Sequence, residues 1–248
     1  MLKRLLIERT EGNPFFLEES VRTLVETGAL VGERGAYRRA RAVEHLEIPA
    51  TIQAILAARI DRQSPEDKRL LQAAAVVGKD VPMPLLLAIA EAPEDEVRTG
   101  LGRLQAAEFL YETSLFPELE YTFKHALTHE VAYGSILHER RRALHARIVD
   151  SIETSYAARI SEQVERLGHH ALRAESWDRA IAYLKQAGAK AASRSANVEA
   201  IDHLTKGLDA LKNIPDGPDR LRLELDLQIA LGPALMTTKG YEIGRAHV

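Results

Sequence analysis

The sequence predicts a mainly α-helical protein with two short stretches of β-structure. Apolar residues recur at helical spacing along almost the whole chain, whereas the alternation typical of strands is confined to two places. Toward the C-terminus, apolar positions repeat at an interval of 34 residues, the period of tetratricopeptide helical hairpins. We therefore expect helices and hairpins in the first part of the chain and helical repeats in the second.

Residues 1–50 are expected to form a helix followed by a β-hairpin. Pro14 suits the first turn of a helix, because proline lacks the N–H that has no partner there. Glu18 and Glu19 follow in the early turns, where the helix dipole favours negative charge, and Gly28 suits the end of the helix. The turn at residues 32–35, Gly-Glu-Arg-Gly, then predicts the hairpin.

Residues 51–155 have the pattern of a winged-helix domain, which consists of three helices and a β-hairpin. Ser64 begins the sequence Ser-Pro-Glu-Asp, a helix start with a cap, a first-turn proline and an acid. Strand-like alternation at Phe109–Glu112 and Glu120–Phe123 flanks a turn at Ser114–Pro117. Helices are expected over Thr51–Arg62, Ser64–Gly78, Met83–Glu91 and Pro93–Ala107.

Residues 156–241 are expected to form tetratricopeptide-like repeats, with a generic antiparallel helix bundle as the alternative. No strand pattern follows Lys124. The pairs at 34-residue spacing are Leu167 with Ile201, His170 with Leu204, and Ala174 with Leu208. Helices are expected over His125–Tyr133, Ile136–Ser155, Ile160–Ala174, Trp177–Ala192, Ala196–Leu211 and from Asp219 onward.

The last segment, residues 242–248, breaks the helical pattern without a cap. Its sequence, Glu-Ile-Gly-Arg-Ala-His-Val, looks like the translation of a common sequencing adapter. We expect a non-native tail and exclude it from fold reasoning. We also expect an open reading frame that is cut at this end, and at its start too.

Composition limits the partners and the compartment. The formal net charge is −3, so bulk charge gives no reason to expect nucleic acid or an anionic membrane as a partner. The absence of cysteine excludes disulfides, thiolate metal sites and cysteine nucleophiles. Apolar runs such as Leu85–Ala90 are far shorter than the ~18 residues of a membrane helix. We expect a cytoplasmic protein.

Motifs that carry catalysis are missing from the sequence. The closest approach to a phosphate-binding loop is Gly78-Lys79, but Asp80 follows, and Ala73 stands where the first glycine belongs. His125 and His129 share one helix face, but the zinc-protease order His-Glu-x-x-His is not met. We therefore assign neither catalytic residues nor metal ligands.

Three stretches together resemble the STAND family of signalling ATPases. They are GNPFFLEE at Gly12–Glu19, the segment Pro49–Arg62, and FKHALTHEVAY at Phe123–Tyr133. The chain is most similar to the C-terminal half of bacterial members that join an adenylate/guanylate cyclase domain, an AAA-type ATPase and tetratricopeptide repeats. The similarity covers nearly all of residues 1–241, and it implies that residues 1–50 are the remnant of an ATPase lid.

The resemblance also implies a nucleotide-binding role for three residues. In the family a Gly-x-Pro motif begins the lid helix and its proline packs on adenine, which corresponds here to Gly12 and Pro14. A histidine after the winged-helix hairpin contacts the β-phosphate of ADP, which corresponds to His125. The usual Met-His-Asp is Lys-His-Ala in this chain, so the acid is absent. A plain helix start for Pro14 and for His125 remains the alternative.

The expected function is therefore regulatory. The chain is expected to be a non-catalytic fragment that closes over ATP or ADP bound by a separate P-loop domain, holds no nucleotide tightly by itself, and binds a protein partner through its repeats. Two alternatives are a stand-alone peptide-binding repeat scaffold and a winged-helix transcriptional regulator. The second is disfavoured because the helix that would enter DNA, Pro93–Glu108, has more acids than bases.

Overall fold

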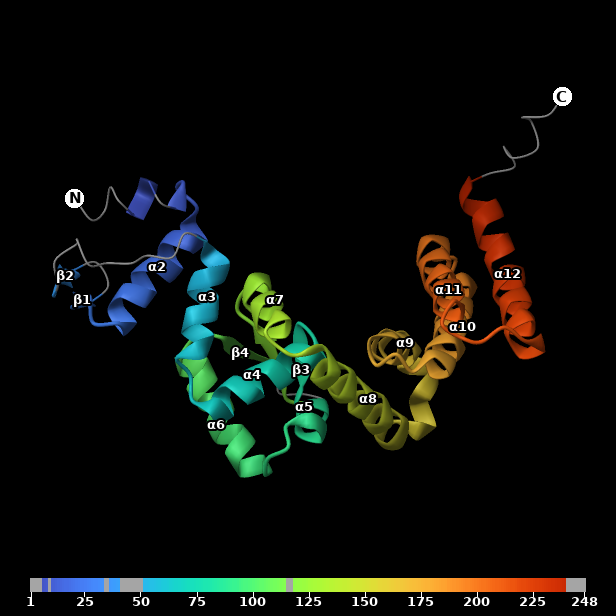
Figure 1. The fold of residues 1–248 in the computed structure, drawn as a ribbon, viewed down its shortest axis with the longest axis horizontal. Helices are drawn as coiled ribbons and strands as arrows, with labels where there is room; N and C mark the ends of the chain where they lie inside the picture. Colours follow the sequence, from blue (N-terminus) through green and yellow to red (C-terminus); the bar gives the residue numbers. More distant parts are fainter. Residues whose placement is uncertain (1–5, 9, 34–35, 41–50, 115–117, 240–248) are drawn as a thin grey trace. The chain divides into compact units, whose positions relative to one another are not determined.

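The computed structural model describes residues 6–8, 10–33, 36–40, 51–114 and 118–239. This part of the chain is mainly α-helical, as the sequence predicts (Figure 1). Contacts divide the chain into unit 1, Met1–Met83 with Ala92–Ile136, and unit 2, Pro84–Glu91 with Leu137–Val248. The domain boundaries expected after residues 50 and 155 fall inside these units, and the expected tail lies outside the described residues.

The first elements of unit 1 are a helix and a small hairpin. Helix α2 (Pro14–Glu26) begins at Asn13, whose side chain accepts a hydrogen bond from the N–H of Phe16 at 3.1 Å. Strands β1 (Leu30–Val31) and β2 (Arg38–Arg39) pair in antiparallel fashion, which confirms the expected hairpin. A small core forms from Leu6, Phe16, Leu24, Ala29, Leu30 and Ile55.

The next two helices begin at the caps that the sequence indicates. Thr51 caps α3 (Ile52–Asp61), and its side chain accepts a hydrogen bond from the N–H of Ala54 at 3.2 Å. Ser64 caps α4 (Pro65–Val77), and its side chain accepts a hydrogen bond from the N–H of Asp67 at 3.1 Å. Unit 1 also contains α6 (Glu94–Ala106) and α7 (Ala126–Gly134). These four helices were expected from periodicity and capping and are thus confirmed.

The larger of the two sheets described in unit 1 has three strands where the sequence predicts two. Strand β5 (Glu120–Phe123) lies between β3 (Asp80–Pro82) and β4 (Leu110–Ser114), and both pairings are antiparallel. Sequence reasoning missed β3 because three residues that include a proline give no measurable alternation. Strand β3 is held by its antiparallel pairing with β5, in which Val81 lies opposite Tyr121. Part of the expected turn before β5 lies outside the described residues.

In the described part of unit 2, all the regular secondary structure is helical. Most of α5 (Met83–Ile89) belongs to it, and the rest are α8 (His138–Ser155), η2 (Ala157–Glu162), α9 (Val164–Arg173), α10 (Trp177–Ser193), α11 (Asn197–Leu211) and α12 (Pro218–Lys239). The helix expected from Ile160 begins at Val164 instead, and a 3-10 helix precedes it. Apolar spacing alone does not separate a short 3-10 segment from the first turn of an α-helix. No helix of the described ranges is long and apolar enough to span a bilayer.

Consecutive helices α9 to α12 pack through a repeated contact in which a leucine lies over a glycine. The three pairs are Gly168 with Leu184, Gly188 with Leu204, and Gly207 with Leu227. A Cβ atom built on Gly188 would lie only 2.6 Å from Cγ of Leu204. The missing side chain at each glycine therefore lets the next helix approach closely.

Replacing Gly188 with alanine is expected to destabilise unit 2. The new methyl group would overlap buried Leu204, a change that costs about 1–3 kcal/mol, against about 1 kcal/mol gained in helix propensity. Gly102→Ala on α6 is the matched control, because Gly102 is an exposed glycine of a helix and no heavy atom outside its own helix backbone and chain neighbours lies within 4 Å of its Cβ position. Urea unfolding followed by the emission of Trp177, the single tryptophan, should show a loss of stability for Gly188→Ala. Unfolding followed by circular dichroism should show a small gain of stability for Gly102→Ala. An unchanged Trp177 transition in Gly188→Ala would contradict the packing argument.

Candidate functional site

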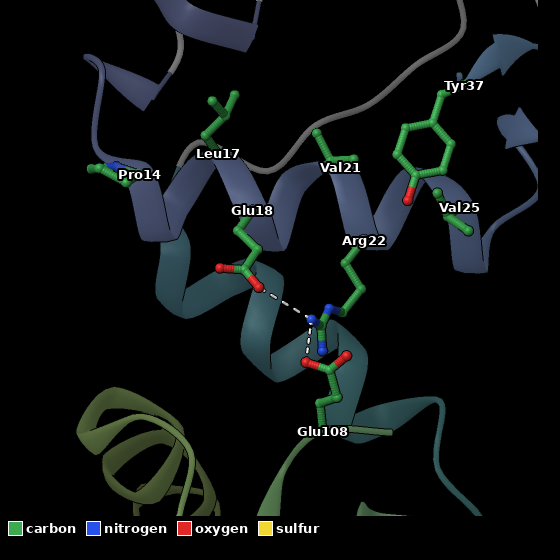
Figure 2. Close-up of a pocket in the computed structure, with 8 residues that line it drawn as sticks. All are labelled: Pro14, Leu17, Glu18, Val21, Arg22, Val25, Tyr37 and Glu108. Carbon is green, nitrogen blue, oxygen red and sulfur yellow. Dashed lines mark hydrogen bonds and ion pairs between the residues drawn. The ribbon is translucent and has the colours of Figure 1, made fainter. Parts of the chain in front are cut away.

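A pocket of about 500 Å³ lies along the outer side of α2 in unit 1 (Figure 2). Pro14 stands at the start of the helix, and Tyr37, from the segment before β2, reaches toward its far end. Most of the lining is apolar, with a charged group at its edge. The lining residues are Pro14, Leu17, Glu18, Val21, Arg22, Val25, Tyr37 and Glu108.

The charged edge of the pocket centres on Glu108, directly after α6. Its carboxylate accepts a hydrogen bond from Arg22 of α2 (Figure 2). It accepts a second hydrogen bond from Lys124. The bond from Lys124, with a further contribution from Arg22, lowers the pKa of Glu108 to about 2, although burial opposes this shift. Glu108 is therefore ionised at neutral pH, and it joins α2 to the segment between α6 and β4.

Beneath α2 lies a buried arginine that sequence reasoning missed. Arg59 of α3, whose side chain is 2% exposed, pairs with equally buried Glu19 of α2. Its Nε also lies 3.2 Å from Glu26, and its Nη2 donates to the carbonyl of Ala107 at 2.8 Å. The guanidinium stands 4.7 Å from the ring centroid of Phe109, a cation–π distance. One satisfied buried cation thus links α2, α3 and the end of α6.

This arrangement corrects the expected role of Glu19. The sequence favoured a dipole interaction for both Glu18 and Glu19, but neither lies in the first turn of α2 as the structure defines it, and Glu19 is a buried ion-pair partner. Helical geometry could have indicated this burial. Adjacent side chains on a helix point about 100° apart, so one of the two neighbouring acids must face inward. Nothing local in the sequence identifies Arg59 as the partner.

The structure brings the two motifs of the sequence analysis together at His125. This residue is the N-cap of α7, and its ring lies against Phe15, which follows Pro14, with a centroid separation of 4.0 Å. Its Nε2 is buried, and none of the residues that the structure describes forms a hydrogen bond with it. Burial, followed by the nearby charge of Lys124, lowers the pKa of His125, so the ring is neutral at pH 7.

Gly12 and Pro14 are both exposed at the start of α2. Gly12 has φ +75°, which favours glycine, and its N–H donates to the carbonyl of Ile7 at 3.3 Å. Pro14 lines the pocket, whereas Gly12 does not belong to the lining set. The nucleotide-binding roles of Gly12, Pro14 and His125 remain predictions.

His129, the second histidine of the i, i+4 pair, has a structural contact. Its Nε2 lies 2.9 Å from the carbonyl oxygen of Ala75 in α4, and its ring packs edge-on against Phe123. These contacts hold α7 against α4 and the sheet. Within the described ranges, no group of three or more histidine, aspartate or glutamate side chains has a geometry that suits a metal ion.

The chain has a detectable relative of much greater length. No protein-family model matches the chain. It is 29% identical over 197 residues to an uncharacterized protein of Rhizobium meliloti (strain 1021). The match covers 77% of this chain and 19% of the relative, so the chain spans about a fifth of the relative's length. The description of that relative gives no activity.

Proposed function

We propose that this chain is a non-catalytic regulatory and protein-interaction segment of a nucleotide-switched signalling ATPase or cyclase. In this proposal α2 belongs to the lid over a nucleotide that a separate P-loop domain binds, and unit 2 relays the state of the lid to a protein partner. The observation that carries the proposal is the contact of Phe15 with His125, because it joins the two motifs to which a nucleotide-binding role is ascribed.

The order of elements supports a winged-helix module in the middle of the chain. The chain order α4-β3-α5-α6-β4-β5 and the sheet order β3-β5-β4 are those of that fold. The consecutive packing of α9 to α12, together with the 34-residue spacing of buried Leu167 and half-buried Ile201, supports tetratricopeptide-like repeats. Both assignments belong to the proposal.

The contacts of unit 1 suggest how a bound nucleotide would act. Arg59 and Glu108 hold α2 on the helices and sheet of unit 1, so a ligand that moved α2 would disturb the buried Arg59–Glu19 pair and the more exposed Arg22–Glu108 pair. A neutral histidine at the start of a helix is a suitable donor to a phosphate. Because Nε2 of His125 is buried and the ring of Phe15 lies against the imidazole, a phosphate contact through Nε2 would require Phe15 or another neighbouring side chain to move. The Phe15–His125 pair would then be the two-state element that ADP biases.

A DNA-binding function receives less support from the same helices. The two arginines of α6 are already paired, Arg98 with Glu94 at 2.6 Å and Arg103 with Asp67 at 2.7 Å. The hydrogen bond from Arg103 lowers the pKa of Asp67, so that carboxylate is charged at neutral pH. Phosphates would have to compete with these pairs on a helix whose first turn carries three acids.

The isolated chain is expected neither to hydrolyse nor to cyclise ATP. The physical reason is that its sequence lacks a phosphate-binding loop with a magnesium-binding hydroxyl. Phosphate release and cyclic-nucleotide formation measured on the purified chain check this. Turnover above a buffer blank that a substitution within residues 1–241 abolishes would contradict the non-catalytic role.

The reading frame upstream of Met1 tests the proposed class. We expect a Gly-x-x-x-x-Gly-Lys-Ser/Thr motif in the same frame, because the proposal requires a P-loop domain to bind the nucleotide that α2 covers. Sequencing of the genomic DNA checks this expectation. An in-frame stop codon directly before Met1, with no such motif upstream, would contradict the proposal.

A further inference from the structure

Unit 2 contains a group of positively charged side chains around the histidines of α8 and α9. The ring centroid of His170 lies 5.0 Å from that of His145 and 5.2 Å from that of His169. His145 and His170 are buried, whereas His169 is exposed. Desolvation of the ring, followed by the charges of Arg173 and Lys206, lowers the pKa of His169. The histidine cluster therefore reaches the surface at His169, close to two cations.

Three of the basic side chains lie on one stripe of α9. Arg166, His169 and Arg173 follow one another at helical spacing, and at roughly 100° per residue they fall within an arc of about 60°. The stripe is about 10 Å long, because each residue of an α-helix rises about 1.5 Å. Arg166 is half-buried, and the other two side chains are exposed. A ligand in solution can therefore reach all three.

Cations of the neighbouring helices extend the stripe. After burial, His169 and Arg173, the charge of Arg141 of α8 also contributes to the lowered pKa of His145. Lys206 of α11 acts on His169 in the same way. Helices α8, α9 and α11 thus each contribute positive charge to one part of unit 2. We call this part the basic surface, and it consists of Arg141, Arg166, His169, Arg173 and Lys206.

The positive charge at the centre of the basic surface is not neutralised by the nearest acid of α9. Glu165 precedes Arg166, but its carboxylate binds Lys190 at 2.9 Å and Arg194 at 3.3 Å. Among the described residues, no carboxylate forms an ion pair with Arg166 or His169. Positive groups placed close together repel one another, and a negatively charged partner relieves this repulsion.

The size of the basic surface favours a protein partner over a nucleic acid. A nucleic acid needs a continuous positive track for its successive phosphates. Here the positive stripe is about 10 Å long, and carboxylates border it, since Glu165 adjoins Arg166 and Asp202 pairs with Lys206. A short segment with a few acidic side chains matches this pattern, because its negative charges are separate from one another.

We propose that the basic surface of unit 2 binds an acidic segment of the protein partner, with Arg166, His169 and Arg173 as the main contacts. The inference rests on the proposed function, which assigns a protein partner to unit 2, and it adds the chemistry of that partner. A guanidinium can donate two parallel hydrogen bonds to one carboxylate of the segment. Because the ion pairs are exposed to solvent, the interaction is weak and depends on salt.

Titration of a fluorescently labelled oligoglutamate peptide with the full chain tests the proposal. Binding is expected at low ionic strength, and added salt should weaken it. An oligoglutamine peptide of the same length should not bind. The double variant Arg166→Gln/Arg173→Gln should weaken the binding of oligoglutamate by about tenfold, because two ion pairs with the peptide are lost. Circular dichroism and Trp177 emission verify that the variant is folded.

The double variant Arg179→Gln/Arg222→Gln is the matched control, because it removes the same charge from unit 2 at other places. Arg179 lies beside Asp150 and Glu153, and Arg222 lies near Asp226, so an acidic peptide should avoid both. This control should leave the affinity for oligoglutamate nearly unchanged.

Three results would overturn the proposal. They are no binding of oligoglutamate at low ionic strength, equal weakening by the two double variants, and tighter binding of a single-stranded oligodeoxythymidylate that Arg166→Gln/Arg173→Gln abolishes. The titration contains no adenine nucleotide and uses unit 2. Its failure would therefore leave the proposed role of α2 over a nucleotide intact, and failure of that role would leave the result of the titration intact.

Discussion

Arg59→Ala is expected to lower the free energy of unfolding of unit 1 by about 3–5 kcal/mol. The substitution leaves buried Glu19 without its cation and removes the donor to the carbonyl of Ala107. It also leaves a cavity beside Phe109, on which the guanidinium lies. Removing one member of a buried pair costs much more than the pair itself contributes, because the remaining charge is desolvated and unpaired.

Arg62→Ala is the control for this variant. Arg62 lies on the same helix end and also pairs with Glu26, at 2.9 Å, but both side chains are more than a third exposed. The loss of this exposed pair should lower the free energy of unfolding by less than about 1 kcal/mol. Urea unfolding followed by circular dichroism reports both units, and Trp177 emission reports unit 2 alone. If the two variants lost similar amounts of stability, or if only the Trp177 transition were destabilised, Arg59 would not hold unit 1 together.

Unit 2 is expected to lose stability in mild acid through a buried histidine pair. His145 of α8 and His170 of α9 are each 1% exposed, and their Nδ1 atoms lie 2.8 Å apart. One ring must donate and the other accept, so the accepting ring is neutral. Burial, followed by nearby positive groups, lowers the pKa of His145 to about 3 and that of His170 to about 2. The positive groups are Arg141, Arg166, Arg173 and, when protonated, His169.

The sign of the effect follows from these lowered values. Below the unfolded pKa of about 6.5, the unfolded chain binds protons that the folded pair does not bind, so stability falls as the pH drops from that value. As the pH falls from 6.5 to 4.5, the pair should lower the free energy of unfolding of unit 2 by on the order of 3–5 kcal/mol. The urea midpoint of the Trp177 transition, measured at several pH values, gives this dependence.

The double variant His145→Leu/His170→Leu separates the histidine pair from other titrating groups. It removes both imidazoles, so its midpoint should depend much less on pH between 6.5 and 4.5 than that of the natural chain. Carboxylates elsewhere in unit 2 titrate equally in both proteins and cancel in the comparison. The same pH slope in the two proteins would show that the histidine pair does not control acid stability.

Local signals predicted the helices and the hairpins well, and long-range pairing accounts for what they missed. Capping by Ser64 and Thr51 depends on residues three positions apart, so the sequence contains the whole signal. Strand β3 is held by its partner β5, some 40 residues along the chain, and no local pattern reports it. Nothing in the local sequence at the end of α3 marks Arg59 as buried; its burial depends on the pairing with Glu19 of α2.

In the candidate site, too, local motifs identify some residues, whereas long-range packing determines the other contacts. Gly12, Pro14 and His125 were singled out from motifs that resemble a known family. The contact of Phe15 with His125 joins segments 110 residues apart, and neither motif predicts it. The buried pair His145–His170 has no motif at all, because its two members lie on different helices and become neighbours only when α8 packs on α9.

ADP release from the longer polypeptide that joins this chain to its P-loop domain is the most direct test of the proposed function. His125→Ala should weaken ADP binding by roughly tenfold or more, because a hydrogen bond to a charged phosphate is lost, while the fold is retained. His129→Ala should lower stability through the lost contact with the carbonyl of Ala75, and should leave ADP release unchanged in the folded protein. Equal ADP release rates for His125→Ala, His129→Ala and the natural protein would contradict a nucleotide-sensing role for His125.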